Sequence, residues 1–214
     1  MPFRDRADAG RRLAEALAGH AGEDATVLAL PRGGVPVAAE VAQALKAPLD
    51  LVLVRKIGAP FDEELAMGAV ADAGTPCTVR NEDVIASLGV DKATFEAVRL
   101  RELAEIERRR EAYLKGRARA KVEGRVAIVV DDGVATGATT RAALLAVRMQ
   151  RPSKVVLAVP VAPIETLEVL RREADEVVCP EPQVFLGSIG AYYDDFRQVS
   201  DETVTATLAR FPPA

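Results

Sequence analysis

A cluster of potentially reactive side chains follows one apolar run near the middle of the chain. The run is Val126–Val130, and the residues that follow it are Asp131, Asp132, Gly133, Thr136, Gly137, Thr139 and Thr140. Five apolar residues, most of them branched at Cβ, are typical of a strand buried on both faces of a parallel sheet. The run from Arg141 to Gln150 favours a helix. The pattern is therefore a strand, a glycine turn and a helix start, with two carboxylates where the strand ends.

This arrangement suits a phosphorylated sugar. Backbone N–H groups at a helix start point toward a bound phosphate, and the positive end of the helix dipole lies beneath them. Threonine hydroxyls can donate further hydrogen bonds, whereas Asp131 and Asp132 would repel a phosphate. These carboxylates suit the hydroxyls of a ribose, as acceptors, or a divalent cation. The loop as a whole predicts a ribose 5-phosphate site.

Other phosphate-binding motifs fit this loop less well. A Walker A loop requires Lys after its second glycine, where this chain has Ala138, and the spacing of Gly133 and Gly137 lacks the G-x-G-x-x-G of a dinucleotide site. The alternative without function is an ordinary strand–turn–helix junction in which Asp and Thr serve as caps.

The segment Val129–Thr139 resembles the 5-phosphoribosyl-1-pyrophosphate (PRPP) binding motif of type I phosphoribosyltransferases, and the order of elements around it agrees with that fold. The resemblance implies that Asp131 and Asp132 hold the ribose hydroxyls. It also implies that the following loop anchors the 5-phosphate, through Gly133, Val134, Ala135, Thr136, Gly137, Ala138, Thr139 and Thr140. Ala135 matches the adenine-type branch, because the hypoxanthine-type branch has a base-contacting Asp at that place.

A second strand–turn–helix unit precedes this one. The strand Thr26–Leu30 ends at Pro31–Pro36, and a helix is expected over Val37–Leu45, with Pro36 suited to its first turn. Gly33 and Gly34 would let the backbone approach a ligand closely. The resemblance implies that Arg32, Gly33 and Gly34 form the pyrophosphate loop. A tight turn with one exposed arginine is the alternative.

Two cations follow a third expected strand, Leu49–Val54. Arg55 and Lys56 would then lie at the carboxyl end of a parallel strand, where open α/β sheets bind ligands. They resemble the Arg-Lys-x-Gly that opens the mobile catalytic loop of adenine-type enzymes, which implies that both contact PRPP and that Lys56 reaches pyrophosphate on loop closure. Two solvated surface cations are the alternative.

The middle of the chain carries elements outside this repeating pattern. Short strands at Leu65–Val70 and Cys77–Val79 predict a β-hairpin flap, and Asp62, Glu63 and Glu64 are expected in a mobile loop, as a solvated face. Residues Asp91–Ala120 predict a long charged helix that projects from the sheet or packs on another chain. An earlier helix, Arg4–Ala18, is expected to pack outside the sheet.

Aromatic residues gather beyond the last expected core strands, which are Lys154–Val161 and Glu176–Cys179, with a helix Ile164–Glu173 between them. In the resembled fold the segment after the core forms a hood over the acceptor, here Pro182–Phe196. Phe185, Tyr192 and Tyr193 are therefore candidates to bind the acceptor, since a planar heterocycle stacks on an apolar face. Asp194 and Asp195 offer an acceptor for a ring N–H. Alternatively, these rings only anchor an irregular segment to the core. A final helix should start at Ser200.

Alternation of strands and helices predicts an α/β fold with a doubly wound, mostly parallel sheet. At 214 residues and 49% hydrophobic, the chain is expected to form a single domain over residues 1–214. Its core would comprise about 24–60 and 122–180, the flap and long-helix insertion 61–121, and the hood 181–200.

Composition and charge indicate which kinds of partner the protein binds and in which cellular compartment it is expected. A net charge of −4 without a basic block argues against nucleic acid, and no apolar run approaches the roughly 20 residues of a membrane span. The first residues contain no signal-peptide core, and Cys77 and Cys179 are isolated, which favours reduced thiols in the cytoplasm. The single histidine, His20, makes a histidine-based triad or metal cluster improbable.

The resemblance implies an enzyme that moves the phosphoribosyl group of PRPP to a nitrogen nucleophile, a nucleobase or related heterocycle, and releases pyrophosphate. Arg32, Lys56, Asp131 and Asp132 would be its catalytic residues, and it would act as a homo-oligomer such as a dimer. Mg²⁺ would be held chiefly by PRPP oxygens and water, with Asp131 and Asp132 as indirect ligands. One alternative is a PRPP-sensing regulatory protein without catalysis. An enzyme that makes PRPP is another, although such chains are longer.

Overall fold

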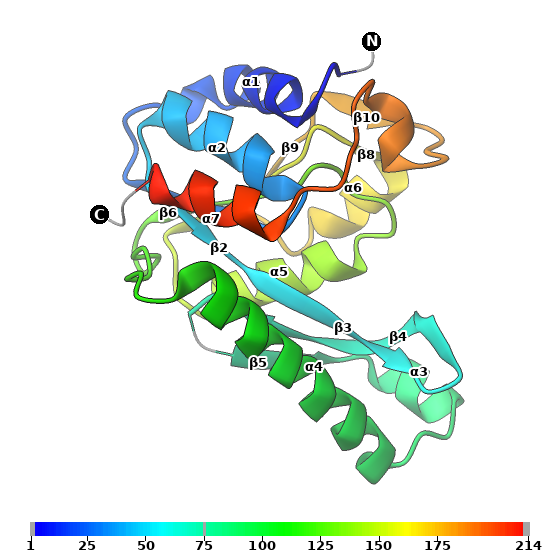
Figure 1. Ribbon diagram of the computed structural model, residues 1–214. Coiled ribbons are helices and arrows are strands. Elements are labelled where there is room, and N and C mark those ends of the chain that lie inside the picture. Colours follow the sequence, from blue (N-terminus) through cyan, green and yellow to red (C-terminus); the bar gives the residue numbers. More distant parts are fainter. Residues whose placement is uncertain (1–2, 75, 212–214) are drawn as a thin grey trace.

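The computed structural model describes residues 3–74 and 76–211, and a five-stranded parallel sheet forms its centre (Figure 1). The strand order is β2-β1-β6-β7-β9. The strands are β1 (Ala25–Ala29), β2 (Leu49–Leu51), β6 (Val126–Val130), β7 (Lys154–Ala158) and β9 (Glu176–Val178). Neighbours pair in parallel throughout, with Val27 opposite Ile128 and Ile128 opposite Val156. The parallel α/β sheet expected from the sequence is confirmed.

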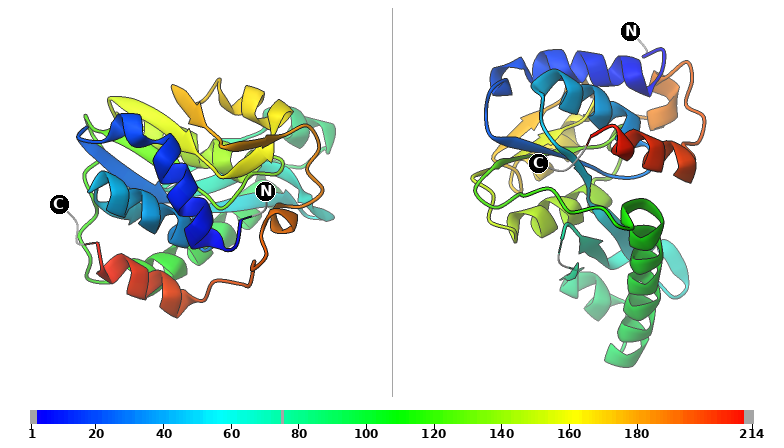
Figure 2. Two further views of the ribbon diagram at one scale, coloured as in Figure 1. Left: turned by 90° about the horizontal axis from the view of Figure 1, so that it is seen from above. Right: turned by 60° about the vertical axis from the view of Figure 1, so that its left-hand side comes forward.

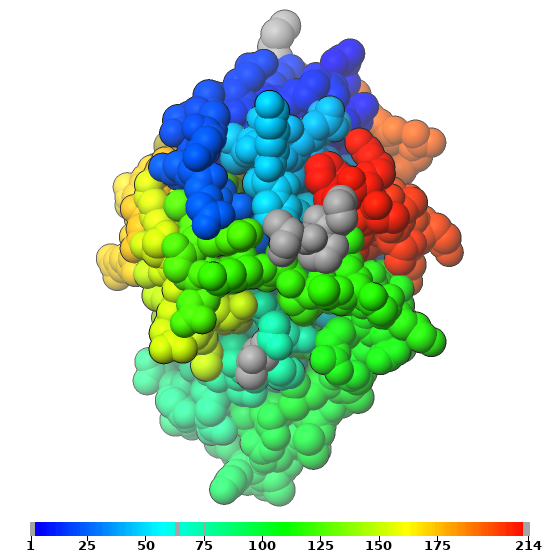
Figure 3. Space-filling model, turned by 90° about the vertical axis from the view of Figure 1, so that its left-hand side faces the viewer, coloured from blue at the N-terminus to red at the C-terminus, as the bar shows by residue number. Residues whose placement is uncertain are grey.

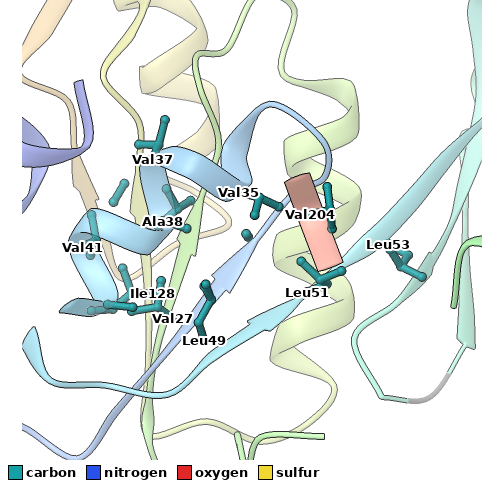
Figure 4. Close-up of a cluster of buried hydrophobic side chains, with 14 of the residues drawn as sticks. Val27, Val35, Val37, Ala38, Val41, Leu49, Leu51, Leu53, Ile128 and Val204 are labelled. Atoms are coloured by element: carbon teal, nitrogen blue, oxygen red, sulfur yellow. The ribbon is translucent and has the colours of Figure 1, made fainter. Parts of the chain in front are cut away.

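Helices cover both faces of this sheet, as Figure 2 shows from above and from the side. On one face lie α1 (Arg6–Ala16), α2 (Gly34–Leu45) and α7 (Asp201–Ala209), and on the other α5 (Ala138–Arg148) and α6 (Ile164–Leu170). Successive strand residues point to opposite faces, so Val27 and Ile128 pack with α2 (Figure 4), whereas Leu28 and Val129 pack with α5. The doubly wound arrangement is confirmed, and a short 3₁₀ helix (Ala18–His20) follows α1.

The flap is a separate antiparallel sheet of three strands. These are β3 (Leu53–Ala59), β4 (Asp62–Asp72) and β5 (Pro76–Arg80), in the order β3-β4-β5. The expected strand Leu49–Val54 is divided: β2 ends at Leu51, the N–H of Val52 still donates to the carbonyl of Ala29, and the chain then enters the flap as β3. The expected hairpin therefore gains a third strand, because β4 provides a pairing partner for the extended chain beyond Val52.

Two helices flank the flap, α3 (Glu82–Ser87) and α4 (Lys92–Leu114). The expected helix Asp91–Ala120 is shorter at its end, and its N-cap is Asp91, whose side chain accepts from the N–H of Thr94. Its apolar side is buried in this chain, since Phe95 and Ile106 pack in the same hydrophobic cluster as Ile57 of β3. In Figure 3 the flap and α4 form the lower part of the molecule. Among the helices that the structure describes, no helix has the length and apolar character that a membrane crossing requires.

The hood begins with β10 (Glu181–Gln183), which pairs in parallel with β8 (Val161–Pro163) of the core, and continues to a 3₁₀ helix, η2 (Ile189–Tyr192). The expected strand Lys154–Val161 is interrupted after Ala158, so that Val161 pairs with Glu181 of the hood and not in the central sheet. The last helix begins where the sequence predicts, because the Ser200 side chain accepts from the N–H of Thr203 at 3.2 Å. The hood thus follows directly from the carboxyl edge of the sheet.

Candidate functional site

The acidic pair lies directly after β6, at the carboxyl edge of the central sheet. Asp131 is partly exposed and Asp132 is buried. The N–H of Asp132 donates to Oδ1 of Asp131 over 2.9 Å. Burial and the neighbouring Asp132 raise the pKa of Asp131 well above its usual value, and burial raises the pKa of Asp132 against the opposing effect of Arg6. Two carboxyl groups this close in a low-dielectric site resist carrying two charges. The site therefore favours a ligand that supplies hydroxyl donors or positive charge.

The loop after β1 packs on this acidic pair. A Cβ on Gly33 would lie 2.0 Å from Oδ2 of Asp132, and a Cβ on Gly34 would lie 2.9 Å from Cα of Asp131. Real Cβ atoms do not approach other atoms so closely, so only glycine fits at either position. The sequence suggested that these glycines make room for a ligand, and the structure adds that they make room for the acidic pair. The Pro31–Arg32 peptide bond in this loop is cis.

Arg32 extends from the same loop toward the C-terminal helix. Its Nη1 lies 3.4 Å from Oδ1 of Asp201, the first residue of α7, and a third of the side chain is exposed. Oη of Tyr113, from the last turn of α4, donates to the same Oδ1 over 2.7 Å. These two donors hold the pKa of Asp201 below its usual value, chiefly through Tyr113, and burial raises the pKa of Tyr113 to about 12. Arg32 is thus placed by two helices that the sequence analysis did not connect with the site.

Residues 131–137, here called the threonine loop, connect β6 to α5, as the sequence predicts. Gly137 adopts a left-handed conformation (φ 80°) just before the helix, where a residue with a side chain would be strained. Thr136 and Thr139 are exposed at the helix start, while Thr140 is buried. Two hydrogen bonds fix the loop: Val134 N–H to the carbonyl of Val161, and Thr166 Oγ1 to the carbonyl of Ala135. The exposed helix start has the properties of an anion-binding site.

Arg55 and Lys56 lie elsewhere than expected. Both are inside β3 of the flap, and neither lies at the carboxyl end of a strand of the central sheet. Nε of Arg55 donates to Oε2 of the buried Glu102 on α4 over 2.9 Å, so its charge is used to hold the flap against that helix. Lys56 pairs with Ala69 of β4, and as the next residue along the strand it points to the opposite face from Arg55. Val54, on that same face, packs in the cluster under α5.

The three aromatic residues of the hood that were candidates to bind the acceptor have different surroundings. Phe185 is 83% exposed, and Tyr192 is half-buried with its hydroxyl 3.5 Å from the carbonyl oxygen of Phe185. Tyr193 is buried between the rings of Phe3 and Phe196, at centroid distances of 5.3 and 4.9 Å, and its hydroxyl donates to the carbonyl of Asp132 over 2.5 Å. Tyr193 therefore has the alternative role described above, in which an aromatic ring anchors the hood to the core.

A groove of about 590 Å³ separates the hood from the threonine loop. It is lined by Ala135, Thr136, Pro163, Glu165, Thr166, Val169, Leu186 and Gly187. The hood also contacts the threonine loop at Gly133. A Cβ at this position would lie 2.6 Å from the Ile189 side chain. The lining is mostly apolar, with one carboxylate and two threonines, which suits a small, partly apolar ligand.

Besides Tyr113 and Asp201, a third residue of the site was not anticipated from the sequence. Arg6, at the start of α1, reaches the acidic pair, and Nε lies 2.7 Å from Oδ2 of Asp132. Nothing in the local sequence distinguishes it from the other arginines of α1, because its partner is 126 residues away. Among the described residues no group of three His, Cys, Asp or Glu side chains is placed to hold a metal ion.

Comparison with known proteins agrees on one assignment. Residues 4–195 match the model of a family described as "Phosphoribosyl transferase domain". "Putative phosphoribosyl transferase Rv0571c" of Mycobacterium tuberculosis is 47% identical over 208 residues, which cover 97% of this chain. The match covers 46% of that relative, so the chain spans about half the length of the curated relatives it matches. A solved structure of TT1426 from Thermus thermophilus is 45% identical, with a TM-score of 0.86 over 99% of this chain and 100% of that one.

Proposed function

Because the chain belongs to the phosphoribosyl transferase domain family, we propose that it transfers the 5-phosphoribosyl group of PRPP to a nitrogen atom of a nucleobase or related heterocycle and releases pyrophosphate. The observation that carries this proposal is the contact between the Gly33–Gly34 turn and the acidic pair, beside the exposed start of α5. A ribose carries its 5-phosphate and its 1-pyrophosphate at opposite ends. Two anion-binding turns with carboxylates between them match that distribution of charge.

Each part of PRPP has a counterpart in this arrangement. The 5-phosphate would bind the helix start, where Thr136 and Thr139 present hydroxyls beside backbone N–H groups. The ribose hydroxyls would donate to Asp131, the more exposed of the two carboxylates. The pyrophosphate would contact the backbone of Gly33 and Gly34, with Arg32 as its cation. A ribose diol would also favour the charged form of Asp131, whose pKa is raised in the free protein.

Transfer breaks the bond between C1 and the pyrophosphate oxygen, whose electron pair leaves with pyrophosphate, and forms a bond from C1 to the acceptor nitrogen. C1 gains positive charge as the first bond breaks, and the carboxylate of Asp131 would stabilise it. Arg32 and the N–H of Gly33 would stabilise the leaving anion, since the N–H of Gly34 already donates to the carbonyl of Leu30 over 3.0 Å. Lys56 would add a second cation from the flap. The acceptor nitrogen then gives up its proton to the departing pyrophosphate or to water.

The carboxylates near the proposed PRPP site are compatible with a Mg²⁺ ion that is bound mainly by the substrate. Mg²⁺ keeps several waters and prefers a few carboxylates together with substrate phosphates. Of the two adjacent carboxylates, Asp132 is already bonded to Arg6, and the part of the chain that the structure describes has no group of three ligating side chains. Asp131 and Asp132 would therefore act indirectly, through PRPP oxygens and water. When bound, the ion would neutralise charge on the pyrophosphate.

The acceptor would lie in the groove between the threonine loop and the hood. Ala135 lines this groove and supplies no carboxylate for the base. Phe185 and Tyr192 are exposed enough to move over a planar ring in that groove, whereas the buried Tyr193 would act by holding the hood in place. Stacking of a base on an aromatic ring contributes roughly 1–3 kcal/mol.

Calorimetric titration with PRPP and Mg²⁺ tests the proposal. We expect the wild-type protein to bind PRPP, and Asp131→Asn to weaken binding about 10- to 100-fold, since a hydrogen bond to a charged group contributes roughly 1.5–3 kcal/mol. Asp24→Asn is the matched control, because Asp24 precedes β1 at the opposite edge of the sheet and is mostly exposed. Absence of PRPP binding by the wild type, or equal binding by Asp131→Asn, would refute the assignment.

A further inference from the structure

Arg6 joins the first turn of α1 to the acidic pair through a nearly buried ion pair. The side chains of Arg6 and Asp132 are only 11% and 12% exposed, and Nε donates to Oδ2 over 2.7 Å. A charged pair that is so enclosed is held in one geometry, because solvent does not compete for either partner. Asp132 consequently has one of its two carboxylate oxygens committed to α1.

The rest of the Arg6 guanidinium contacts the hood. Nη1 donates to the carbonyl of Arg197 over 2.8 Å, and Cζ lies 3.9 Å from the centroid of the Phe196 ring. Phe196 packs on Tyr193, whose hydroxyl returns to the carbonyl of Asp132. The four residues Arg6, Asp132, Tyr193 and Phe196 therefore form a closed ring of contacts between α1, the acidic pair and the hood.

Backbone hydrogen bonds hold the N-terminal segment against the same part of the hood. The N–H of Phe3 donates to the carbonyl of Tyr192 over 2.7 Å, and the N–H groups of Asp194 and Asp195 donate to the carbonyls of Phe3 and Arg4. The ring of Phe3 packs on Tyr193 and is completely buried. These backbone hydrogen bonds fix the position of the start of α1. The Arg6 guanidinium is therefore placed by the backbone as well as by its own side-chain contacts.

Asp132 also determines the position of the turn that would hold pyrophosphate. Its Oδ2, the atom that Arg6 holds, fills the space in which a Gly33 side chain would stand. Asp131 lies against Gly34 in a similar way, and it remains partly exposed. If Asp132 moved, the turn at Gly33 would lose the surface on which it packs. The loop N–H groups would then change their position relative to Asp131.

We propose that Arg6 is a positioning residue: it fixes the Asp132 carboxylate against Gly33, and this shapes the pyrophosphate turn and leaves Asp131 as the carboxylate that contacts the ribose. The inference rests on the proposed function for its ligand, PRPP, but the positioning itself is a property of the free protein. Arg6 does not touch substrate in this scheme. Its effect on PRPP passes through Asp132 and the Gly33–Gly34 turn.

The test compares Arg6→Ala and Arg6→Lys with Arg11→Ala, a matched control on the same helix whose side chain is 47% exposed. In the free protein, the ¹⁵N–¹H signals of Gly33 and Gly34 should move in Arg6→Ala and stay in place in Arg11→Ala. By calorimetry with Mg²⁺, Arg6→Ala should bind PRPP at least tenfold more weakly. Arg6→Lys should recover part of that loss, because the ammonium keeps the charge and one donor but not the planar geometry.

A purely structural role for Arg6 predicts a different result. It would lower the melting temperature and leave the Gly33 and Gly34 signals and the PRPP affinity of the folded protein unchanged, and this result would overturn the inference. If Arg6→Ala does not fold, Arg6→Gln keeps an N–H donor and similar length, and the same comparison decides. A wild-type protein that fails to bind PRPP would refute the proposed function, while the two glycine signals would still show whether Arg6 sets the turn.

Discussion

Gly33 shows how a residue can be required for space and not for backbone conformation. Its φ of −60° and ψ of −38° are open to any residue, but an added Cβ would lie 2.0 Å from Oδ2 of Asp132. We expect Gly33→Ala to displace either the turn or the carboxylate and to weaken PRPP binding at least tenfold, measured by calorimetry. Gly19→Ala is the control, because a Cβ there meets no atom within 4 Å. Equal PRPP affinity in Gly33→Ala would contradict the role assigned to this contact.

We expect the Asp131 carboxylate to lower the free energy of unfolding at neutral pH, although it contributes to PRPP binding. Its pKa is raised in the folded state, so between about pH 4, its usual pKa, and the raised value the folded protein binds more protons than the unfolded one. The free energy of unfolding should therefore fall as pH rises through that range. Asp131→Asn removes the contribution of Asp131 to this dependence and can still accept the N–H of Asp132, so its melting temperature at pH 7 should exceed that of the wild type. A lower melting temperature for Asp131→Asn in calorimetric scans would contradict this.

At the scale of elements, the flap determines what Lys56 can do. Lys56 lies inside β3, on the face opposite to the Arg55–Glu102 pair, so a movement of the flap would carry Lys56 with it. A contact made only after closure contributes mainly to the transition state. We expect Lys56→Ala to lower kcat far more than it raises the KM for PRPP, with Lys92→Ala on α4 as the control. A pure KM effect would make Lys56 a ground-state contact.

The elements that could be predicted from the sequence are those with a local signal. The runs Val126–Val130 and Lys154–Ala158 are apolar throughout or nearly so because both faces of the sheet are covered, and the glycine and threonine pattern marks the turns between strand and helix. The division of Leu49–Val54 between two sheets had no such signal, since apart from Asp50 both halves are apolar. It depends on which strand pairs with each half, and β4 decides that for the second half.

At the scale of the whole molecule, the candidate site brings together residues from α1, the turn after β1, α4, the loop after β6, the hood and α7. Asp131, Asp132 and the glycine turns were predictable from their spacing, but the partners Arg6, Tyr113 and Asp201 were not. These partners are ordinary charged or aromatic helix residues, and only the tertiary arrangement places them at the carboxyl edge. Residue types that bind a ligand can thus be recognised locally, whereas the residues that position them depend on the complete fold.

Turnover with a panel of acceptors decides between phosphoribosyl transfer and PRPP binding alone. The wild-type protein, PRPP and Mg²⁺ would be incubated with purine bases, pyrimidine bases and related nitrogen heterocycles, and pyrophosphate release and product mass would be measured. We predict pyrophosphate release that depends on one acceptor or a few, a product whose mass equals that acceptor joined to a ribose 5-phosphate, and loss of both in Asp131→Asn. Tight PRPP binding without pyrophosphate or nucleotide product for any acceptor would contradict transfer and would favour a PRPP-sensing protein.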